Sequence, residues 1–447
     1  MRIIIVGAGE VGYHLAETLS KHEQDVVVVE SNAERAEYIG ERLDVMTVVG
    51  SGASISVLEE AGVSNAGLFL AVTDRDEANI IGCLAADRLG VRHKVARVSN
   101  PEFYIEGSVL SREHLGIDLM INPERECAWE TFQLLGSEAA TELVRFADGK
   151  VFLIGLRVRE GAPVAGKSIQ ELDRELGARR YTTVAIVRGR QTEIPRGPSR
   201  IEAGDQIFLV TPSSEMRHLP ALAGFDSYSL RRVMIAGGSL EALHLARYLE
   251  EHGVACTILD RDRARCVELS KALPDALVLH GDATDAELLE MEGVAGVDGF
   301  VAYTDQDETN LLSGLLAKAS GARKVISLLD RQQYLPVATR LGVDAAVSPR
   351  MSAVNTILRY LHRANVSRVA ALRGVEAEAA EVRIGERARA LGRPLREIEF
   401  PRGGVVGAIV RDGRVITPRG DDAVEPGDHV VLFAEPGAMS AMERLFA

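Results

Sequence analysis

The chain contains the same sequence pattern twice, and this duplication limits the possible folds more than any other feature. Residues of the first half recur in the second half at a shift of 230 or 231 positions. The matched pairs are Gly7 with Gly237, His14 with His244, Glu30 with Asp260, Gly50 with Gly281, Thr73-Asp74 with Thr304-Asp305, Asn79 with Asn310 and Gly90 with Gly321. A nearly constant shift of this length indicates duplication of a whole multi-domain unit, because solenoid repeats span only about 20–50 residues.

Each half begins with short apolar runs that alternate with helical stretches. In the first half, the predicted strands are Ile3–Val6, Asp25–Glu30, Val45–Val49, Leu68–Ala71, Val95–Arg97 and Leu119–Ile121. Strands that alternate with helices of about 10–15 residues are typical of βαβ units and a parallel sheet. We therefore predict an α/β fold in which a doubly wound, Rossmann-type domain occupies residues 1–136 and its duplicate occupies residues 230–362.

The pattern changes after about Ala139. The predicted strands of this region are Val151–Arg157, Thr183–Arg188 and Gln206–Val210. The region is duplicated as well, since Ala185–Arg188 matches Ala408–Arg411. We therefore expect a small β-rich α+β lobe over residues 137–225 and a second lobe over residues 363–447.

Charge and composition argue against several classes of protein. The 447 residues include 51 Lys and Arg against 65 Asp and Glu, a net charge of −14, which argues against a sequence-independent nucleic-acid binder. No apolar run approaches the ~18 residues of a membrane span. The four cysteines form no CxxC pair, so we expect reduced thiols, a cytosolic location and no metal site.

A glycine-rich turn follows the first predicted strand. Gly7, Gly9 and Gly12 form a GxGxxG motif. In nucleotide-binding βαβ units, the first glycine permits a tight turn, the second lets the backbone approach a pyrophosphate, and the third allows close packing of helix on strand. Glu30 ends the second strand, where an acid accepts hydrogen bonds from ribose hydroxyls and repels the 2′-phosphate of NADP. Together these features favour an adenine dinucleotide site over a purely structural turn.

Polar residues after three further strands are candidate ligand contacts, and each has a structural alternative. Thr73 and Asp74 follow the fourth strand, where Asp74 and Glu77 could instead form a capping box. Arg97 ends the fifth strand and could bind a phosphate or form a surface salt bridge. The segment Gly50–Ser54 follows the third strand, where an adenine would lie, and its last serine could instead cap a helix.

The second copy departs from this pattern where phosphates would bind. Gly9 is matched by Ser239, whose Cβ opposes close approach of a phosphate, and Glu241 adds negative charge to the first helical turn. Arg97 is matched by Leu328. The candidate contacts that the second copy retains are Asp260, Thr304 and Asp305. We therefore expect the first domain to bind a dinucleotide and the second to bind it less well or not at all.

Several motifs together support a resemblance to a known family. They are Gly7–Gly12, Gly50–Ser54 and Thr73–Asn79 in the first copy, and Gly281–Thr284 and Tyr303–Asn310 in the second. With these motifs the chain resembles, along its full length, the TrkA family of peripheral subunits of bacterial Trk potassium uptake systems. The resemblance implies two RCK units (regulators of potassium conductance), each with a nucleotide-binding domain and a C-terminal lobe. It also implies a cytoplasmic gating ring, at the inner face of the cell membrane, beneath a membrane K⁺ channel subunit.

The resemblance further implies that the chain binds NAD(H) and also ADP or ATP. The family's dinucleotide-contacting positions fall on Gly7, Ala8, Gly9, Glu10, Val11, Glu30, Thr73, Asp74 and Arg97. The rival interpretation is an NAD-dependent oxidoreductase. Such an enzyme needs an acid or base beside the nicotinamide, and the short lobe after Ala139 offers none that its spacing singles out. We therefore expect a regulator without catalytic residues.

Duplication of the whole unit suits a ring of repeats, so we expect a homo-oligomer, as a tetramer whose eight units form the ring. The helices after Pro123 and Pro349 are the candidate contacts between units. Their apolar stripes consist of Cys127, Ala128, Phe132 and Leu135 in the first helix, and of Met351, Val354, Ile357, Leu358 and Leu361 in the second. An ordinary core face is the alternative, because an amphipathic helix has the same pattern in both settings.

Overall fold

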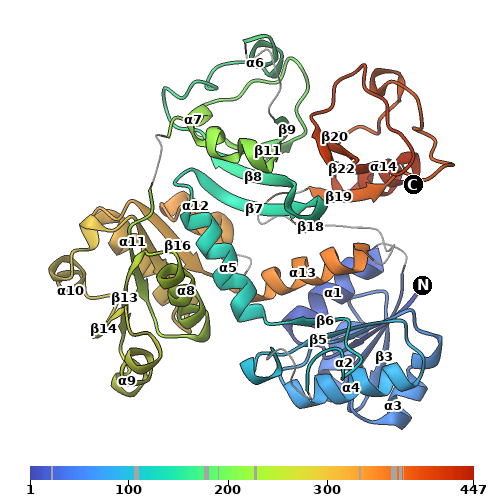
Figure 1. Ribbon diagram of the computed structural model, residues 1–447, viewed down its shortest axis with the longest axis horizontal. Helices are drawn as coiled ribbons and strands as arrows, with labels where there is room; N and C mark the ends of the chain where they lie inside the picture. Colours follow the sequence, from blue (N-terminus) through green and yellow to red (C-terminus); the bar gives the residue numbers. More distant parts are fainter. Residues whose placement is uncertain are drawn as a thin grey trace. The chain divides into compact units, whose positions relative to one another are not determined.

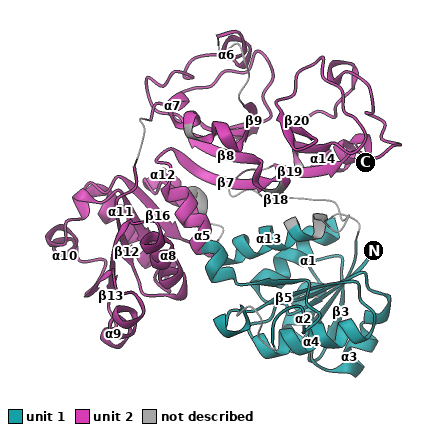
Figure 2. Cartoon of the chain, in the orientation of Figure 1, with its two compact units in different colours: residues 1–127, 349–364 teal, residues 128–348, 365–447 magenta. Residues whose placement is uncertain are grey.

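The structure is a computed structural model, and it describes residues 1–21, 24–104, 110–175, 181–189, 191–225, 229–331, 334–363, 370–371, 375 and 377–446. The chain forms two compact units (Figure 2), one of residues 1–127 and 349–364 and the other of residues 128–348 and 365–447. Two of the expected domain boundaries adjoin the stretches 226–228 and 364–369, which lie outside the described residues.

The first unit contains a six-stranded parallel sheet (Figure 1). Its strand order is β3-β2-β1-β4-β5-β6. Its strands are β1 (Arg2–Val6), β2 (Asp25–Glu30), β3 (Met46–Val49), β4 (Leu68–Ala71), β5 (His93–Arg97) and β6 (Leu119–Ile121). The helices between them are α1 (Glu10–Lys21), α2 (Ala33–Gly40), α3 (Ile55–Glu60), the 3₁₀ turn η1 (Val63–Asn65), α4 (Asp76–Arg88) and η2 (Pro101–Tyr104). The predicted doubly wound fold is therefore confirmed, and its strand order reverses between β1 and β4.

The second unit contains a sheet of the same order, β14-β13-β12-β15-β16-β17. Its strands are β12 (Arg232–Ala236), β13 (Ala255–Asp260), β14 (Leu277–His280), β15 (Gly299–Ala302), β16 (Lys324–Leu328) and β17 (Ala345–Val347). Its helices are α8 (Leu240–Glu251), α9 (Arg263–Ala272), α10 (Ala286–Met291), η5 (Val294–Gly296), α11 (Asp307–Ala319) and α12 (Leu335–Leu341). In both sheets the central strands are apolar and almost fully buried, as expected when helices cover both faces of a parallel sheet.

Two antiparallel five-stranded sheets make up the C-terminal lobes, with strand orders β10-β9-β11-β8-β7 and β18-β19-β22-β20-β21. The first lobe contains β7 (Ala140–Phe146), η3 (Ala147–Gly149), β8 (Val151–Arg157), α6 (Ile169–Glu175), β9 (Thr182–Arg188), β10 (Gln191–Glu193), β11 (Gln206–Pro212), η4 (Ser213–His218) and α7 (Leu219–Leu222). The second contains β18 (Ala370–Ala371), β19 (Glu378–Arg383), η7 (Leu395–Glu397), β20 (Gly404–Arg411), β21 (Arg414–Ile416), β22 (His429–Ala434) and α14 (Pro436–Phe446). The lobes are β-rich as predicted, although β7 and β10 were not among the predicted strands.

The two lobes share one hydrophobic core within the second unit. Phe146 and Phe208 of the first lobe belong to the same buried cluster as Val410 and Phe433 of the second. A backbone N–H also links the lobes, because Ala147 donates to Glu381 Oε2 at 2.7 Å.

Helices α5 (Pro123–Leu135) and α13 (Pro349–Arg363) follow the last strands of the two parallel sheets. In the second unit, the Phe132 ring of α5 lies 4.5 Å from the imidazole of His252. In the first unit, α13 packs against α1 and β6. The apolar stripes expected to contact other subunits are therefore largely buried inside the chain, at Cys127, Ala128, Leu135, Met351, Val354, Ile357 and Leu358. For these residues the core-face alternative is correct, and the side chain of Leu361 lies outside the described residues.

Within the described part of the chain, no helix combines the length and the apolar character needed to cross a membrane. The four cysteines are free thiols and are buried.

Candidate functional site at the carboxyl edge of the first sheet

The glycine turn after β1 has the geometry of a phosphate-binding turn. Gly7 adopts a φ of +99°, and its N–H donates to the Val29 carbonyl oxygen at 2.8 Å. A Cβ on Gly12 would lie 1.8 Å from the Gly7 carbonyl oxygen, so only glycine fits there. A Cβ on Gly9 would meet no described atom within 4 Å. Backbone conformation therefore explains why position 7 is glycine, and packing explains position 12. Packing does not require glycine at position 9, where the absence of a Cβ would let a ligand approach the backbone closely.

The Glu30 carboxylate is fixed beside this turn at the end of β2. Its Oε2 accepts the Ala8 N–H at 2.6 Å, and its Oε1 accepts the Asn32 N–H at 2.9 Å. Burial would raise the pKa of Glu30, but the N–H groups of Asn32 and Ala8 outweigh burial and lower it. Glu30 is therefore an ionised acceptor at the place where a ribose would lie.

Arg35 is a neighbour of this turn that the sequence analysis missed. Its Nε donates to the Ala8 carbonyl oxygen at 2.6 Å, from the first turn of α2. Arg265 donates to the Gly238 carbonyl oxygen at 2.5 Å in the same way. Arg35 and Arg265 are 230 residues apart, the same shift that relates the two glycine turns. This match was the sequence signal that could have identified both arginines.

A buried asparagine organises the turn after β4. Asn79 is fully buried, and its Oδ1 accepts from the N–H and the hydroxyl of Thr73 at 3.0 and 2.7 Å. Its Nδ2 donates to the carbonyl oxygens of Thr73 and Arg97 at 3.0 and 2.8 Å. One side chain thus joins the carboxyl ends of β4 and β5. Asn310 makes the corresponding four bonds in the second unit.

The capping alternatives for two of the turns are not supported. Helix α4 begins at Asp76 with Arg75 in the N-cap position, so Asp74 is not its cap and is exposed. Asp76 instead accepts the N–H groups of Ser99 and Asn100, at 3.0 and 2.8 Å. At α3, Ser54 occupies the N-cap position without a side-chain cap bond.

Arg97 forms a salt bridge at the same edge of the sheet. Its Nη2 lies 3.1 Å from Glu124 Oε1, at the start of α5, and the two side chains are 27% and 14% exposed. The other oxygen of Glu124 accepts the Ser99 hydroxyl at 3.0 Å. The partly buried pair keeps Arg97 at the carboxyl edge, where a phosphate would have to compete with Glu124.

The second unit repeats the ribose-site geometry but not the open helix start. Asp260 Oδ2 accepts the Gly238 N–H at 2.5 Å, as Glu30 accepts that of Ala8. Ser239 is the N-cap of α8, and its hydroxyl accepts the Ala242 N–H at 3.3 Å. Asp305 lies 3.4 Å from Arg261 on the surface, while Leu328 is buried. A side chain of the protein thus occupies a helical N–H that would otherwise be available to a phosphate.

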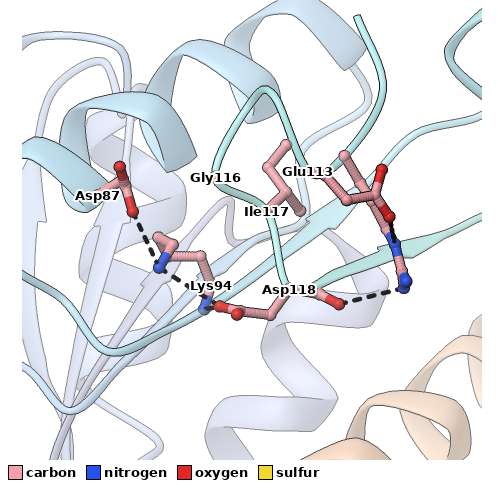
Figure 3. Close-up of a pocket in the computed structure, with 7 residues that line it drawn as sticks. Asp87, Lys94, Glu113, Gly116, Ile117 and Asp118 are labelled. Carbon is pink, nitrogen blue, oxygen red and sulfur yellow. Dashed lines mark hydrogen bonds and ion pairs between the residues drawn. The ribbon is translucent and has the colours of Figure 1, made fainter. Parts of the chain in front are cut away.

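A separate pocket of about 340 Å³ lies at the opposite, amino end of β5 (Figure 3). Figure 3 shows Lys94 between two carboxylates, with its Nζ 3.2 Å from Asp87 and 3.4 Å from Asp118. Arg112 in turn pairs with Glu113 at 2.7 Å. The cations of this pocket are neutralised within it, and the glycine turn lies at the other end of the sheet. The carboxyl edge of the first sheet is therefore the candidate site.

Two family models match the chain. The model described as the TrkA-N domain matches residues 3–123 and 233–349, and the model described as the TrkA-C domain matches residues 153–224 and 379–447. The Trk system potassium uptake protein TrkA homolog 1 of Methanosarcina mazei is 37% identical over 455 residues, which cover 100% of both chains.

Solved structures of the GsuK channel have a similar fold. The GsuK channel bound to NAD aligns with a TM-score of 0.61 and 20% identity, over 100% of this chain and 78% of that one. GsuK bound to ADP aligns with a TM-score of 0.52 and 16% identity, over 81% and 69% of the two chains. At such low identities the likeness concerns the fold alone.

Proposed function

This chain belongs to the TrkA family, and we propose that it is the cytoplasmic nucleotide-binding regulatory subunit of a Trk potassium uptake system. The observation that carries the proposal is the carboxyl edge of the first sheet, where a turn with an unobstructed Gly9 lies beside the ionised Glu30. This arrangement suits the pyrophosphate and the ribose of an adenine nucleotide. We propose NAD(H) and ADP or ATP as the ligands, and the structures of GsuK bound to NAD and to ADP support this choice.

We further propose that the protein regulates a membrane K⁺ channel subunit at the inner face of the membrane, as part of a homo-oligomeric gating ring, most simply a tetramer. A nucleotide can shift the conformation of such a ring only through its differential affinity for two states. The chain would then act without chemistry of its own. The alternative is an NAD-dependent oxidoreductase.

The deciding experiment is a titration with NADH, NAD, ADP and ATP while potassium flux is recorded through a co-expressed Trk membrane subunit. We expect nucleotides to change the flux without being consumed. A flux that no nucleotide alters would contradict the regulatory role. Oxidation of NADH with turnover on an added substrate would instead support the oxidoreductase.

Glu30→Ala is expected to weaken NADH binding about tenfold, because it removes a charged acceptor from the ribose hydroxyls. Asp260→Ala is the matched control, since Asp260 accepts a turn N–H in the same geometry in the second unit. Its NADH affinity should stay within about twofold of the native value. Calorimetry of the full chain measures both variants, and it should give one strong NADH site per chain. Two equal sites would contradict the inequality of the two domains.

Arg97→Ala is expected to weaken ATP binding about tenfold and NADH binding less, because the loss grows with the phosphate charge of the ligand. Glu124→Gln removes the same salt bridge but leaves the guanidinium in place. It should therefore preserve or strengthen ATP binding. Unchanged ATP affinity in a folded Arg97→Ala variant would make the salt bridge purely structural.

A further inference from the structure

A second arginine reaches the first nucleotide site from a distant part of the sequence. Arg350 is the second residue of α13, which follows β17, the last strand of the second parallel sheet. In the first unit, α13 packs against α1, and the Arg350 guanidinium forms an ion pair with the Glu10 carboxylate. Glu10 is the first residue of α1 and directly follows Gly9 of the glycine turn. The second half of the chain thus supplies a cation beside the phosphate-binding end of α1.

The burial of the pair is uneven. The Arg350 side chain is 12% exposed and that of Glu10 is 72% exposed. The guanidinium is therefore fixed by its surroundings, whereas the carboxylate can swing into solvent. Burial lowers the pKa of His14, Glu17 opposes this change, and the positive charge of Arg350 lowers the pKa further. Since His14 lies one turn along α1 from Glu10, Arg350 sits over the first turn of this helix.

The two repeats place their cations differently around the site. At the strand end, Arg97 is matched by Leu328. The helix that follows the last strand of each parallel sheet begins at Pro123 in the first repeat and at Pro349 in the second. Glu124 is therefore matched by Arg350. The first repeat therefore has Arg97 on its fifth strand and an acid, Glu124, on the helix. The second repeat has Leu328 on the strand and its arginine, Arg350, on the helix. Only the helix position lets the second repeat present a cation to α1 of the first unit.

We propose that Arg350 binds the terminal phosphate of a nucleoside di- or triphosphate on the first glycine turn, in competition with Glu10. This inference rests on the nucleotide binding proposed above. A terminal phosphate carries more negative charge than one carboxylate and accepts a two-pronged bond from a guanidinium. Glu10 at the helix start would repel the same phosphate, so release of its pair with Arg350 removes one obstacle and supplies one donor.

The test compares ATP and AMP binding to full-chain variants by calorimetry. We expect Arg350→Gln to weaken ATP binding at least about tenfold and AMP binding less than about threefold. Glu10→Gln should tighten ATP binding a few-fold, because the Glu10 carboxylate then no longer competes with the phosphate for Arg350. Arg331→Gln is the matched control, since Arg331 lies in the second unit in an ion pair with Glu308. It should bind both ligands like the native chain.

A purely structural ion pair predicts a different result, in which Arg350→Gln and Glu10→Gln weaken ATP binding equally. Equal losses of ATP and AMP would also overturn the inference. If Arg350→Gln fails to fold, Arg350→Lys serves as the second variant, because it keeps the charge but loses the two-pronged geometry. This variant should weaken ATP binding several-fold more than AMP binding. If the native chain binds ATP and none of these variants differs from it, only this inference fails. If the native chain binds no nucleotide, the proposed function fails with it.

Discussion

Replacing Lys324 with methionine is expected to lower the free energy of unfolding of the second unit by about 2–4 kcal/mol. The Lys324 side chain is fully buried, and its ammonium donates to the carbonyl oxygens of Leu134, Ser137 and Ala140. These carbonyls lie between the end of α5 and the start of β7. The Lys324 ammonium therefore links the α5–β7 connection to the first residue of β16. Methionine fills a similar volume but removes three charged hydrogen bonds. The Leu134 and Ser137 carbonyls keep backbone donors at 3.2 and 3.3 Å, which limits the loss.

The control is Lys94→Met, which removes a buried lysine from β5, the equivalent strand of the first unit. Lys94 lies between Asp87 and Asp118, whose side chains are 38% and 37% exposed and can be solvated when the lysine is lost. Urea unfolding should be followed by the fluorescence of Trp129, the only tryptophan, which lies on α5 in the second unit. Lys94→Met should shift this transition by less than about 0.5 kcal/mol. If Lys324→Met also shifts the free energy of unfolding by less than about 0.5 kcal/mol, Lys324 does not stabilise the α5–β7 connection.

The contrast between these lysines shows where sequence reasoning ended. Both are buried and stand within two residues of the start of the fifth strand of their sheets, although the strand registers align Lys324 with His93 and Lys94 with Val325. Their partners differ, because Lys324 contacts a helix end from about 190 residues earlier, and no local periodicity encodes such a contact. The parallel sheets were predictable for the opposite reason. Their strands are continuous apolar runs bounded by turns, and each run is a local signal.

The residues of the candidate site also fall into two groups, those that a local motif predicts and those that depend on contacts between distant parts of the sequence. Gly7, Gly12 and Glu30 belong to a motif with fixed spacing, and the structure places them together. Asn79 was visible as a matched pair with Asn310, but its role needed the distance to Arg97, which is 18 residues away. Arg350 had no signal near the turn, because it comes from the other half of the chain. Strand β7 was missed because Ala140–Phe146 alternates charged and apolar residues only imperfectly.

Gly9→Ala is expected to weaken ATP and NADH binding by about 2–3 kcal/mol, roughly thirtyfold to a hundredfold in Kd, while leaving the fold intact. A Cβ at this position would meet no described atom within 4 Å, so packing does not forbid alanine. The methyl group instead would stand where a pyrophosphate approaches the backbone, and it would separate the phosphate from the N–H groups at the start of α1. Loss of a cap-position glycine should cost stability less than about 1 kcal/mol.

Gly12→Ala provides the opposite case within the same turn. Its Cβ would lie 1.8 Å from the Gly7 carbonyl oxygen, so the turn and α1 would have to separate. This variant should therefore lose thermal stability as well as binding, whereas Gly9→Ala should lose binding alone. Calorimetric titration paired with thermal melting distinguishes the two. If Gly9→Ala binds both nucleotides like the native chain, the turn is a structural βα connection and the phosphates lie elsewhere. If it melts as early as Gly12→Ala, the fold itself requires glycine at position 9, and the open space beside it is not evidence of a ligand site.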